Sequence, residues 1–448
     1  MSISSEPEGL KAPRRRAGGT AYLRSGAVAP FGVYPGRSLE DLARPAIVAA
    51  VRGAELTPGD IDAVVGGSYA SGALTAQRAI RGLGLSARPV LNVENACASS
   101  ASAAACAAAM VRDGGARHVL VLGIEQLSRT GSGLVPLNDD DPDVRIGLIM
   151  PAAYAMRARR YLHEFGASPE QLASVSVKNR HNGSRNGCAR FQQPVTASAV
   201  LDSRMIADPL TLLQCCAGGD GAAALVVSAE PGPGPAVRFA ASAESAGLDT
   251  SDPRDMARSA LTATVARRAY EEAGVGPDEL DVVELHDAFT ISELMYTEAL
   301  GLCGHGEGPE LLKRGDTALD GRVAVNPSGG LLARGHPVGA TGAAQLAEIF
   351  VQLRGEAGPR QGRPRRVGLT HTTGGGISGY DHAACAVHIL VRDHADEDPP
   401  GRSHPSAGHA TRGDDLGCPM TTDCSSAARS ARPSPEPSST YAARPPAR

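Results

Sequence analysis

The sequence predicts a layered α/β protein made of two similar halves, with a long insertion in the first half. Three observations lead to this expectation. The chain of 448 residues contains 53 Gly, and its 42% hydrophobic residues are mainly small or aliphatic, which lets helices and strands pack closely. One order of helix, turn and strand occurs twice. Roughly 100 residues, 126–220, interrupt the first copy and have no counterpart in the second.

Each half begins with an amphipathic helix, a turn and an apolar strand, at residues 38–69 and 255–289. Within these segments "LTPGDIDAVV" matches "VGPDELDVVE" position by position. Each copy continues into a turn of small residues, a helix and another strand, at 97–123 and 335–376. Two copies of one α/β design predict a pseudo-symmetric molecule whose active centre lies where the halves meet.

Composition sets the expected boundaries. We expect a disordered leader at 1–19, a first half at 20–235 and a second half at 236–392. Residues 393–448 are rich in Pro, Ser and Arg and lack periodicity, which predicts a disordered low-complexity tail. The His and Cys residues of this tail match no standard zinc-site spacing, so we expect no metal there.

Charge and hydropathy exclude several classes of protein. A net charge of −4 argues against nucleic acid as a partner. No apolar run approaches the roughly 18 residues that a membrane span needs, and the N-terminal segment is too polar for a signal peptide. The sequence therefore favours a cytoplasmic protein whose nine cysteines are free thiols.

Cys97 stands out because it opens a helix with almost no side-chain bulk, in "NVENACASSASAAACAAAMVRDGG". The positive end of a helix favours an anion, so we expect the thiol of Cys97 to ionise easily and to attack carbonyl groups. A helix of Ala and Ser can be buried between two sheets and so bring this residue to the centre. The alternative is that Cys97 is a small core residue, as we expect Cys106 to be.

Two histidines follow strands in places that match in the two halves. His286 lies in "ELHDAFTISEL", where Asp287 is expected to cap the next helix. His336 lies in "GHPVGATG", a Gly-rich turn that opens the second buried helix and lacks the ending of a phosphate loop. A lone histidine in a loop is usually only solvated. A thiolate that attacks a thioester, however, needs a base and backbone N–H donors, and the Gly-rich "THTTGGGISG" supplies such donors.

From about residue 21 to residue 391 the sequence resembles the thiolase family, in particular its sterol-carrier-protein-x-type, acetyl-CoA acetyltransferase-like branch. The resemblance rests on "NACASS", "ADPLTLLQCCAGGDGAAALVV", "HDAF", "GHPVGATG…QLRGEAG" and the terminal Gly-rich loop. It implies a five-layered αβαβα sandwich that forms dimers or tetramers. It also implies coenzyme A thioesters as substrates, with no permanently bound cofactor and no metal.

The same resemblance implies roles for individual residues. Cys97 would accept the acyl group, and His336 would be the base that activates it. His286 would orient a water molecule or donate to an oxyanion. The backbone N–H of Cys97, together with Gly374, would form an oxyanion hole.

The insert at 126–220 resembles the family's loop domain, which binds coenzyme A. Its segment "VKNRHNGSRNGCAR" is basic enough to meet phosphates, although a solvated surface is an equally valid reading. Arg185, Asp220 and Gly221 are the candidate coenzyme A-binding residues.

The chain departs from the family pattern at the second catalytic cysteine. Thr372 and Leu346 occupy the two places where thiolases carry this residue, and neither can remove a proton from carbon. His371 is a possible auxiliary base, or it only supports the loop. Chains with "HDAF" and no second cysteine resemble subunits that work beside a small OB-fold, zinc-ribbon partner.

The leading hypothesis is acyl transfer through an S-acyl intermediate on Cys97, to a carbon nucleophile or to another thioester. One alternative is a decarboxylative, ketosynthase-like condensing enzyme, and another is a non-catalytic thiolase-like subunit of a complex. A retro-aldol lyase that acts on steroid-type thioesters is disfavoured, because such relatives dispense with the nucleophilic cysteine.

Overall fold

The computed structural model describes residues 18–130, 142–247, 255–375 and 382–393. All of them belong to one folded unit. The expected disordered tail lies, apart from Asp393, outside the described residues, and so does the expected leader apart from Gly18 and Gly19.

Ten strands form one sheet in the order β10-β9-β11-β12-β8-β1-β7-β4-β2-β3. The first half contributes β1 (Tyr22–Val28), β2 (Ala63–Gly67), β3 (Val90–Val93), β4 (His118–Gln126) and β7 (Asp220–Ser228). The second half contributes β8 (Val237–Ala246), β9 (Val282–Glu284), β10 (Ala324–Val325), β11 (Val367–Gly374) and β12 (Ala384–Arg392).

The pairing pattern of the first five strands is repeated by the second five. In the first half β2 runs parallel to β3 and β4, whereas β4, β7 and β1 pair antiparallel. In the second half β9 runs parallel to β10 and β11, whereas β11, β12 and β8 pair antiparallel. The halves join where Tyr22 of β1 pairs with Arg238 of β8. The predicted duplication is therefore present strand by strand.

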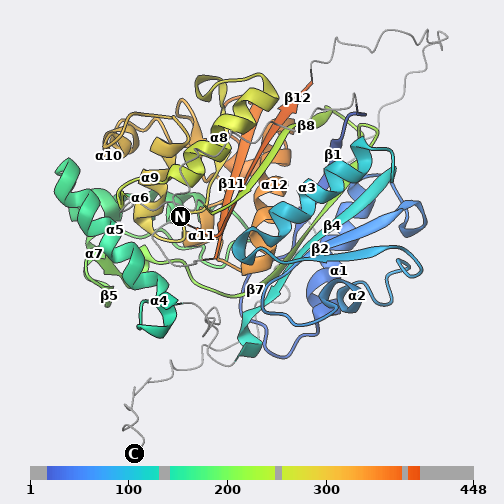
Figure 1. The fold of residues 1–448 in the computed structure, drawn as a ribbon, viewed down its shortest axis with the longest axis horizontal. Coiled ribbons are helices and arrows are strands. Elements are labelled where there is room, and N and C mark those ends of the chain that lie inside the picture. The colour runs from blue at the N-terminus through green and yellow to red at the C-terminus, as the bar shows by residue number, and fades with distance from the viewer. Residues whose placement is uncertain (1–17, 131–141, 248–254, 376–381, 394–448) are drawn as a thin grey trace, which may run out of the picture. The chain divides into compact units, whose positions relative to one another are not determined.

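Helices cover both half-sheets and also separate them. The first half carries α1 (Leu39–Gly53), α2 (Thr75–Ala79) and α3 (Ser99–Arg112); the second carries α8 (Ala260–Ala273), α9 (Thr290–Ala299), α10 (Gly308–Lys313), α11 (Gly330–Ala333) and α12 (Thr341–Arg354). Helix α1 packs on the outer face of β4 and β7, and α8 packs on the outer face of β8 and β12. Helices α3 and α12 share the core between the half-sheets (Figure 1). This arrangement is the expected αβαβα sandwich.

Helices α1 and α8 begin in the same way in the two halves. The side chain of Ser38 accepts a hydrogen bond from the backbone N–H of Asp41, and Ser259 accepts one from Thr262. Such caps satisfy donors that the first helical turn leaves unpaired. The repeat seen in the sequence thus includes the signals that start its helices.

The absence of bulk in α3 allows unusually close contact at the centre. A Cβ atom on Gly67 of β2 would lie 2.5 Å from the backbone of Ser100, and one on Gly342 of α12 would lie 2.5 Å from the backbone N of Ala101. The backbone N–H of Ala343 donates to Ser100 Oγ at 2.9 Å. The prediction for Cys106 was wrong, because α3 leaves one stripe uncovered and this cysteine is exposed on it.

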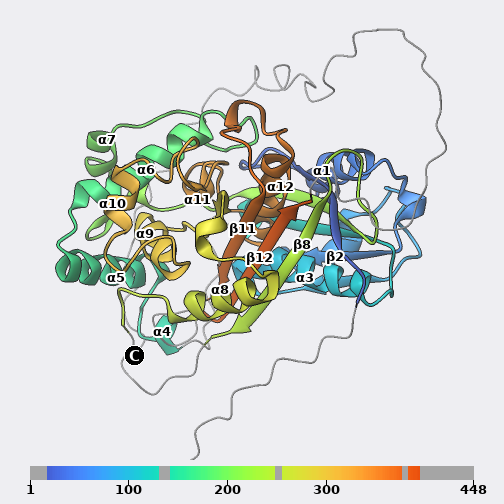
Figure 2. The same cartoon turned by 90° about the horizontal axis from the view of Figure 1, so that it is seen from above.

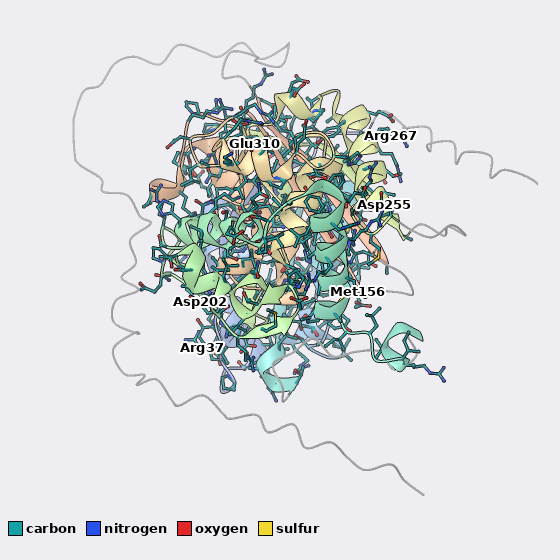
Figure 3. All side chains as sticks on the ribbon, turned by 90° about the vertical axis from the view of Figure 1, so that its left-hand side faces the viewer. Arg37, Met156, Asp202, Asp255, Arg267 and Glu310 are labelled. Carbon is teal, nitrogen blue, oxygen red and sulfur yellow. The ribbon has the colours of Figure 1, made fainter. Side chains whose placement is uncertain are left out.

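The insert between β4 and β7 is mainly helical. It contains α4 (Pro142–Arg145), α5 (Met150–Phe165), α6 (Pro169–Gly183), α7 (Ala197–Leu201), β5 (Met205–Ala207) and β6 (Leu210–Thr211). These helices lie on the same side of the unit as α9, α10 and α11 (Figure 2). Figure 3 views this side, where Met156 of α5 is 41% exposed. Among the described residues, no helix combines the length and the apolarity that a membrane crossing requires.

We predict that acid destabilises the fold through buried histidines such as His388 on β12. Its Nε2 lies 3.2 Å from the carbonyl oxygen of Ala101, which can only accept, and its Nδ1 lies 2.9 Å from Ser242 Oγ. Burial lowers the pKa of His388 to about 4. The unfolded chain binds a proton below about pH 6.5 and the native chain does not, so stability falls as the pH drops from about 6.5 to about 4.

The measurement is the melting temperature of the wild type and of His388→Gln at pH 8, 6 and 5. We expect the melting temperature to fall less steeply with acid in His388→Gln, because glutamine does not titrate. His305→Gln, at a half-exposed histidine, is the control and should keep the wild-type slope. Equal slopes in all three proteins would contradict a role for the buried imidazole.

Candidate active site

Cys97 lies in a strained turn between β3 and α3. It belongs to a single 3₁₀ turn, Ala96–Ala98, that leads directly into α3. Ala96 has a left-handed backbone with φ 48°, a conformation that alanine adopts at a cost. The backbone N–H of Asn95 donates to Ser99 Oγ at 3.0 Å, and that of Ala98 donates to the carbonyl of Asn95 at 2.9 Å. The turn therefore holds a partly exposed Cys97 at the N-terminal end of the central helix.

His336 contacts the sulfur of Cys97 from the other half of the molecule. Its Nε2 lies 3.3 Å from Cys97 Sγ, and its Nδ1 lies 2.8 Å from Thr341 Oγ1. The hydroxyl of Thr341 donates its hydrogen to the carbonyl of Pro337 at 3.2 Å, so it accepts from Nδ1–H. Nε2 is left with a lone pair that faces the sulfur. This tautomer is the one that a base for the Cys97 thiol requires.

His286 completes a cluster of three residues. One ligand-type atom each from Cys97, His286 and His336 lies within 4.8 Å of the others. The two imidazole rings meet edge to face, with centroids 5.1 Å apart. The Nδ1 atom of His286 is buried and has no hydrogen-bond partner in the described structure. The sequence thus identified three residues that the fold brings together.

The loop that carries His286 is anchored on both sides. The carboxylate of Asp287 accepts from the backbone N–H of Leu331 at 2.7 Å and from the side-chain amide of Asn179 at 2.8 Å. The prediction that Asp287 caps the following helix was wrong, because it caps α11 instead. The backbone N–H of Cys216 donates to the carbonyl of Ala288 at 2.8 Å. These contacts tie the histidine loop to α11 and to the insert.

Burial leaves the cluster uncharged. It raises the pKa of the Cys97 thiol to about 12, against a smaller opposing effect of a hydrogen bond from the backbone N–H of Gly375. Burial also lowers the pKa of His336 to about 3 and that of His286 well below the ordinary value. The expectation of an easily ionised Cys97 was therefore wrong, because loss of solvent outweighs the favourable helix end. At neutral pH the site holds a neutral thiol beside neutral imidazoles.

The Gly-rich loop meets Cys97 at Gly375, one residue beyond the predicted position. A hydrogen bond from the Gly375 backbone reaches the Cys97 sulfur. Gly374 instead packs against the turn itself, where an added Cβ would lie 2.1 Å from the carbonyl oxygen of Asn95 and 3.0 Å from the backbone N of Ala98. The backbones of Gly375 and of Cys97 itself thus both lower the pKa of the thiol, and Gly374 permits the close approach of the loop to the turn.

Glu125 was not identified from the sequence, yet it connects the strands to the turn that follows His336. It is fully buried at the end of β4. Its carboxylate accepts from the backbone N–H groups of Tyr69, Ala70 and Gly339 at 2.9, 3.0 and 3.0 Å, and from Ser71 Oγ at 2.6 Å. The sequence gives no signal for this role, because the groups that Glu125 binds lie in other segments of the chain.

Comparison with known proteins now adds an independent line of evidence. Residues 24–231 match the family "Thiolase, N-terminal domain", and residues 242–388 match "Thiolase C-terminal domain-like". The chain belongs to the thiolase family. The first match ends just after β7 and the second begins within β8, close to the join between the duplicated halves.

Several thiolase relatives cover most of the chain. It is 38% identical to the benzoylsuccinyl-CoA thiolase subunit BbsB of Thauera aromatica over 357 residues, 77% of this chain and 92% of the relative. It is 38% identical to the acetyl-CoA acetyltransferase of Methanothermobacter thermautotrophicus over 375 residues, 81% of this chain and 97% of the relative. It is also 35% identical to human sterol carrier protein 2 over 367 residues, 77% of this chain and 67% of the relative.

Two solved structures share the fold. The structure titled "Ltp2-ChsH2(DUF35) aldolase" matches with a TM-score of 0.73 and 28% identity, over 84% of this chain and 99% of that chain. Human mitochondrial 3-ketoacyl-CoA thiolase matches with a TM-score of 0.62 and 17% identity over the same shares, which supports the fold alone.

The places of the second thiolase cysteine are filled by groups that hold no free base. Thr372 is buried on β11, and its hydroxyl donates to Gln345 at 2.6 Å. Leu346 of α12 is fully buried in the central core. His371, the possible auxiliary base, is buried with its Nε2 3.0 Å from Thr262 Oγ1 of α8. Its ring thus faces the outer helical layer.

Two candidate coenzyme A-binding residues serve the packing of loops instead. Asp220 is fully buried, and its two carboxylate oxygens accept from the backbone N–H groups of Ser128 and Tyr34. A Cβ on Gly221 would lie 2.3 Å from the ring of Phe31. Both residues are therefore buried at the start of β7 and contact protein groups, and their assignment to coenzyme A stays a prediction.

The basic segment of the insert is turned largely inward. Lys178 forms an ion pair with Glu293 at 2.7 Å and is 11% exposed. The guanidinium of Arg180 lies 4.2 Å from the ring centroid of Phe191. Arg185, the third candidate for coenzyme A, is exposed. Arg185 is thus the exposed one of these three cations, and its assignment to coenzyme A stays a prediction.

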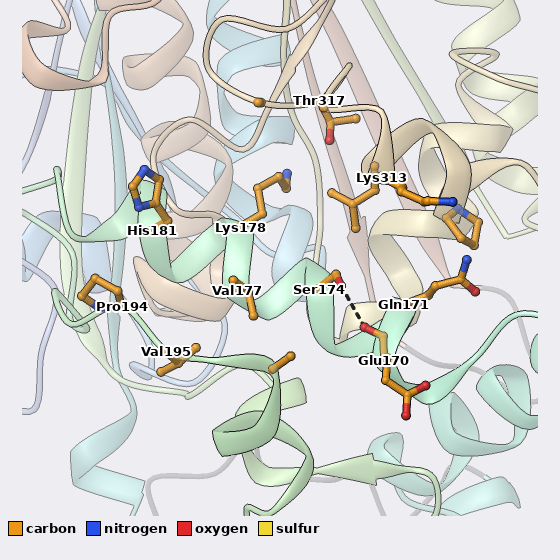
Figure 4. Close-up of a pocket in the computed structure, with 15 residues that line it drawn as sticks. Glu170, Gln171, Ser174, Val177, Lys178, His181, Pro194, Val195, Lys313 and Thr317 are labelled. Carbon is orange, nitrogen blue, oxygen red and sulfur yellow. Dashed lines mark hydrogen bonds between the residues drawn. The ribbon is translucent and has the colours of Figure 1, made fainter.

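A cavity of about 690 Å³ opens on the insert, away from the cluster (Figure 4). It lies between α6 and α10, and its lining includes Lys178, His181 and Lys313. Cys97 and the two clustered histidines are not part of the lining. This cavity is therefore separate from the candidate catalytic centre.

Cys97, His286 and His336 also offer the donor types of a zinc site. Ligands of tetrahedral zinc lie roughly 3.5 Å apart, so the cluster, whose atoms spread over as much as 4.8 Å, would have to contract around a metal. The expectation that the protein carries no metal stays a prediction. Elemental analysis of the purified protein checks it.

We predict that alkylation of Cys97 by iodoacetamide accelerates with pH and shows no plateau near neutrality. Because burial holds the thiol pKa at about 12, the thiolate fraction should rise about tenfold for each pH unit between pH 6 and 9. Peptide mass spectrometry measures the rate at Cys97. The variant Cys106→Ser removes an exposed competing thiol and should leave that rate unchanged. A plateau below pH 8 would reveal a thiolate–imidazolium pair instead.

Proposed function

We propose that this thiolase-family chain is an acyltransferase that forms an S-acyl intermediate on Cys97 from an acyl-CoA. The observation that carries the proposal is the 3.3 Å contact between Cys97 Sγ and the unprotonated Nε2 of His336. The named activities of the two most similar relatives reported above, a benzoylsuccinyl-CoA thiolase subunit and an acetyl-CoA acetyltransferase, support the same reaction class. Coenzyme A enters as part of the substrate, and no permanently bound cofactor is required.

In the first half-reaction, Cys97 Sγ attacks the carbonyl carbon of the thioester while its proton moves to His336 Nε2. The carbonyl oxygen becomes an oxyanion, which the backbone N–H groups of Cys97 and Gly374, or of Gly375, would stabilise. When the oxyanion collapses, the bond to the coenzyme A sulfur breaks, and that sulfur takes the proton from His336. Atoms and charges balance, and the protein ends as a thioester.

The neutral resting state suits this step. If Cys97 and a histidine formed a thiolate–imidazolium pair in the free enzyme, the site would stabilise that charge before substrate binds. Stabilisation of the free enzyme does not lower the barrier of the reaction. Here charge appears only as the thiol proton is transferred, within a low-dielectric site that contains oriented N–H groups. His286 would act as a second neutral donor, because burial holds its pKa well below the ordinary value.

In the second half-reaction, the acyl group passes from Cys97 to a carbon nucleophile or to another thioester. Thr372 and Leu346 cannot remove a proton from an acceptor carbon, so the acceptor must arrive activated or be deprotonated by His286. A decarboxylative condensation would supply the carbanion without a base and is the alternative. The aldolase title of one structural neighbour raises retro-aldol cleavage, but the Cys97–His336 contact favours acyl transfer.

We also propose that the chain works in an assembly. Strand β3 ends the sheet, and its Leu91 is 47% exposed, so a second copy can pair there to give a homodimer or, with further pairing, a tetramer. One relative is named a subunit, and one structural neighbour is a complex with a DUF35 protein. These names support a small OB-fold, zinc-ribbon partner. Light scattering of the purified chain, with and without such a partner, gives the copy number.

The seven cysteines of the described residues are free thiols. This state agrees with a reducing compartment, and we propose the cytoplasm as the place of action.

The covalent intermediate is tested by intact-protein mass spectrometry after incubation with a panel of acyl-CoAs. We expect an added acyl mass on the wild type and on the control Cys106→Ala, and none on Cys97→Ala. The variant His336→Ala should acylate roughly 10²–10⁴-fold more slowly, the usual contribution of a positioned base. An acyl mass that persists in Cys97→Ala would refute the proposed nucleophile.

The second half-reaction is tested by the fate of the acceptor. If no residue deprotonates acetyl-CoA, its methyl protons should not exchange with D₂O during incubation with the acylated protein. The decarboxylative alternative predicts that the acylated protein condenses its acyl group with a malonyl thioester. Exchange that is lost in His286→Asn but not in His371→Asn would instead assign His286 as the acceptor base.

A further inference from the structure

A buried polar network holds the far side of the loop that faces Cys97. His382 lies just before β12 and is 7% exposed. Its Nδ1 lies 2.7 Å from the carbonyl oxygen of Gly375. Its Nε2 lies 2.5 Å from the hydroxyl of Tyr154 and 3.0 Å from that of Tyr296. One imidazole therefore joins the Gly-rich loop to α5 of the insert and to α9.

The protonation of this network follows from its acceptors. The carbonyl oxygen of Gly375 can only accept, so Nδ1 of His382 carries a hydrogen and donates it. In the neutral ring, Nε2 then has a lone pair and accepts from a tyrosine hydroxyl. Each tyrosine is itself placed by other contacts. Tyr154 stacks on Phe289 in the histidine loop, with ring centroids 4.5 Å apart, and its hydroxyl lies 3.2 Å from that of Tyr296.

Gly375 is the point at which this network meets the catalytic cysteine. Its backbone is left-handed, with φ 69°, and a hydrogen bond from this backbone lowers the pKa of the Cys97 thiol against the larger effect of burial. A Cβ at Gly375 would lie 3.8 Å from the Cβ of Ala96, so the residue sits against the turn that holds Cys97. A glycine is free to rotate its peptide planes. The N–H and the carbonyl of Gly375 belong to two successive peptide units, so a contact that holds the carbonyl also restricts the rotation at Gly375 that would turn the N–H.

We propose that His382 is a positioning residue, which holds the carbonyl of Gly375 and so restricts the backbone rotation that would turn the Gly375 N–H away from the sulfur and the developing oxyanion. Tyr154 and Tyr296 hold the His382 ring, so the insert and α9 control the alignment of a catalytic backbone donor. The role in acyl transfer rests on the proposed function. The alignment of the N–H with Cys97 does not, because it also affects simple alkylation of the thiol.

The test measures the single-turnover rate of Cys97 acylation by acetyl-CoA, using four variants of the full chain. His382→Phe removes the clamp, and we expect a loss of at least about tenfold in rate with unchanged half-saturation, since an oxyanion donor is worth roughly 10²–10³. His382→Asn places an amide donor where Nδ1 lies and should stay within about threefold of the wild type. Tyr154→Phe should fall between them. Tyr161→Phe, a buried tyrosine on the same helix whose hydroxyl bonds to Glu298, should be unchanged.

A second readout separates positioning from general loosening of the structure. The rate of Cys97 alkylation by iodoacetamide, followed from pH 6 to 9, should be lower at every pH in His382→Phe and restored in His382→Asn. The inference is overturned if His382→Phe is alkylated as fast as the wild type. It is also overturned if His382→Asn is alkylated as slowly as His382→Phe. It is also overturned if Tyr154→Phe and Tyr161→Phe have equal rates, a comparison that remains decisive if His382→Phe fails to fold.

The two proposals fail in different ways. If the wild type forms no acyl mass on Cys97 with any acyl-CoA, the proposed function falls, while the alkylation series still decides the inference. If acylation occurs and the His382 series is flat, only the inference falls.

Discussion

The contact between the sulfur of Cys97 and Nε2 of His336 joins residues that are 239 positions apart in the chain, and the rest of the unit is arranged to make it possible. Each residue lies just before one of the two central helices, α3 and α12, which lie against each other between the half-sheets. Larger side chains where the first turns of these helices meet, as at Gly342 and Ala101, would push these ends apart. The run of Ala, Ser and Gly is therefore a requirement of the catalytic distance as well as of packing.

The sequence predicted the parts of this arrangement that depend on local pattern. The duplicated helix–turn–strand order gave the two halves, and the positions of Cys97, His286 and His336 at strand ends or helix starts gave the cluster. What escaped prediction depends on contacts across the fold. The tautomer of His336 is set by a nearby residue, Thr341. The anchoring role of Glu125, in contrast, depends on loops that lie about 55 and more than 200 residues away in the sequence.

The errors in the sequence-based expectations have the same physical origin. The helix terminus was expected to ease ionisation of Cys97, but solvent exclusion by the surrounding layers is the larger effect. Cys106 was assigned to the core although it faces outward. In each case the residue type was read correctly and its surroundings were not, because burial is a property of the whole fold.

The duplication has one further consequence, which concerns how far such a molecule can associate. The doubled sheet has two similar edge strands, β3 and β10. If the β3 edge of one copy could pair with the β10 edge of the next, copies would add head to tail into an open filament. The ends differ, however. Both residues of β10 are buried, and the ammonium of Lys178 from the insert donates to the carbonyl of Val325. Within the described residues, the chain itself therefore covers the edge of the sheet at β10. The insert thereby covers part of the β10 rim, whereas the β3 rim keeps Leu91 47% exposed, so the two ends of the doubled sheet do not offer the same surface to a neighbour.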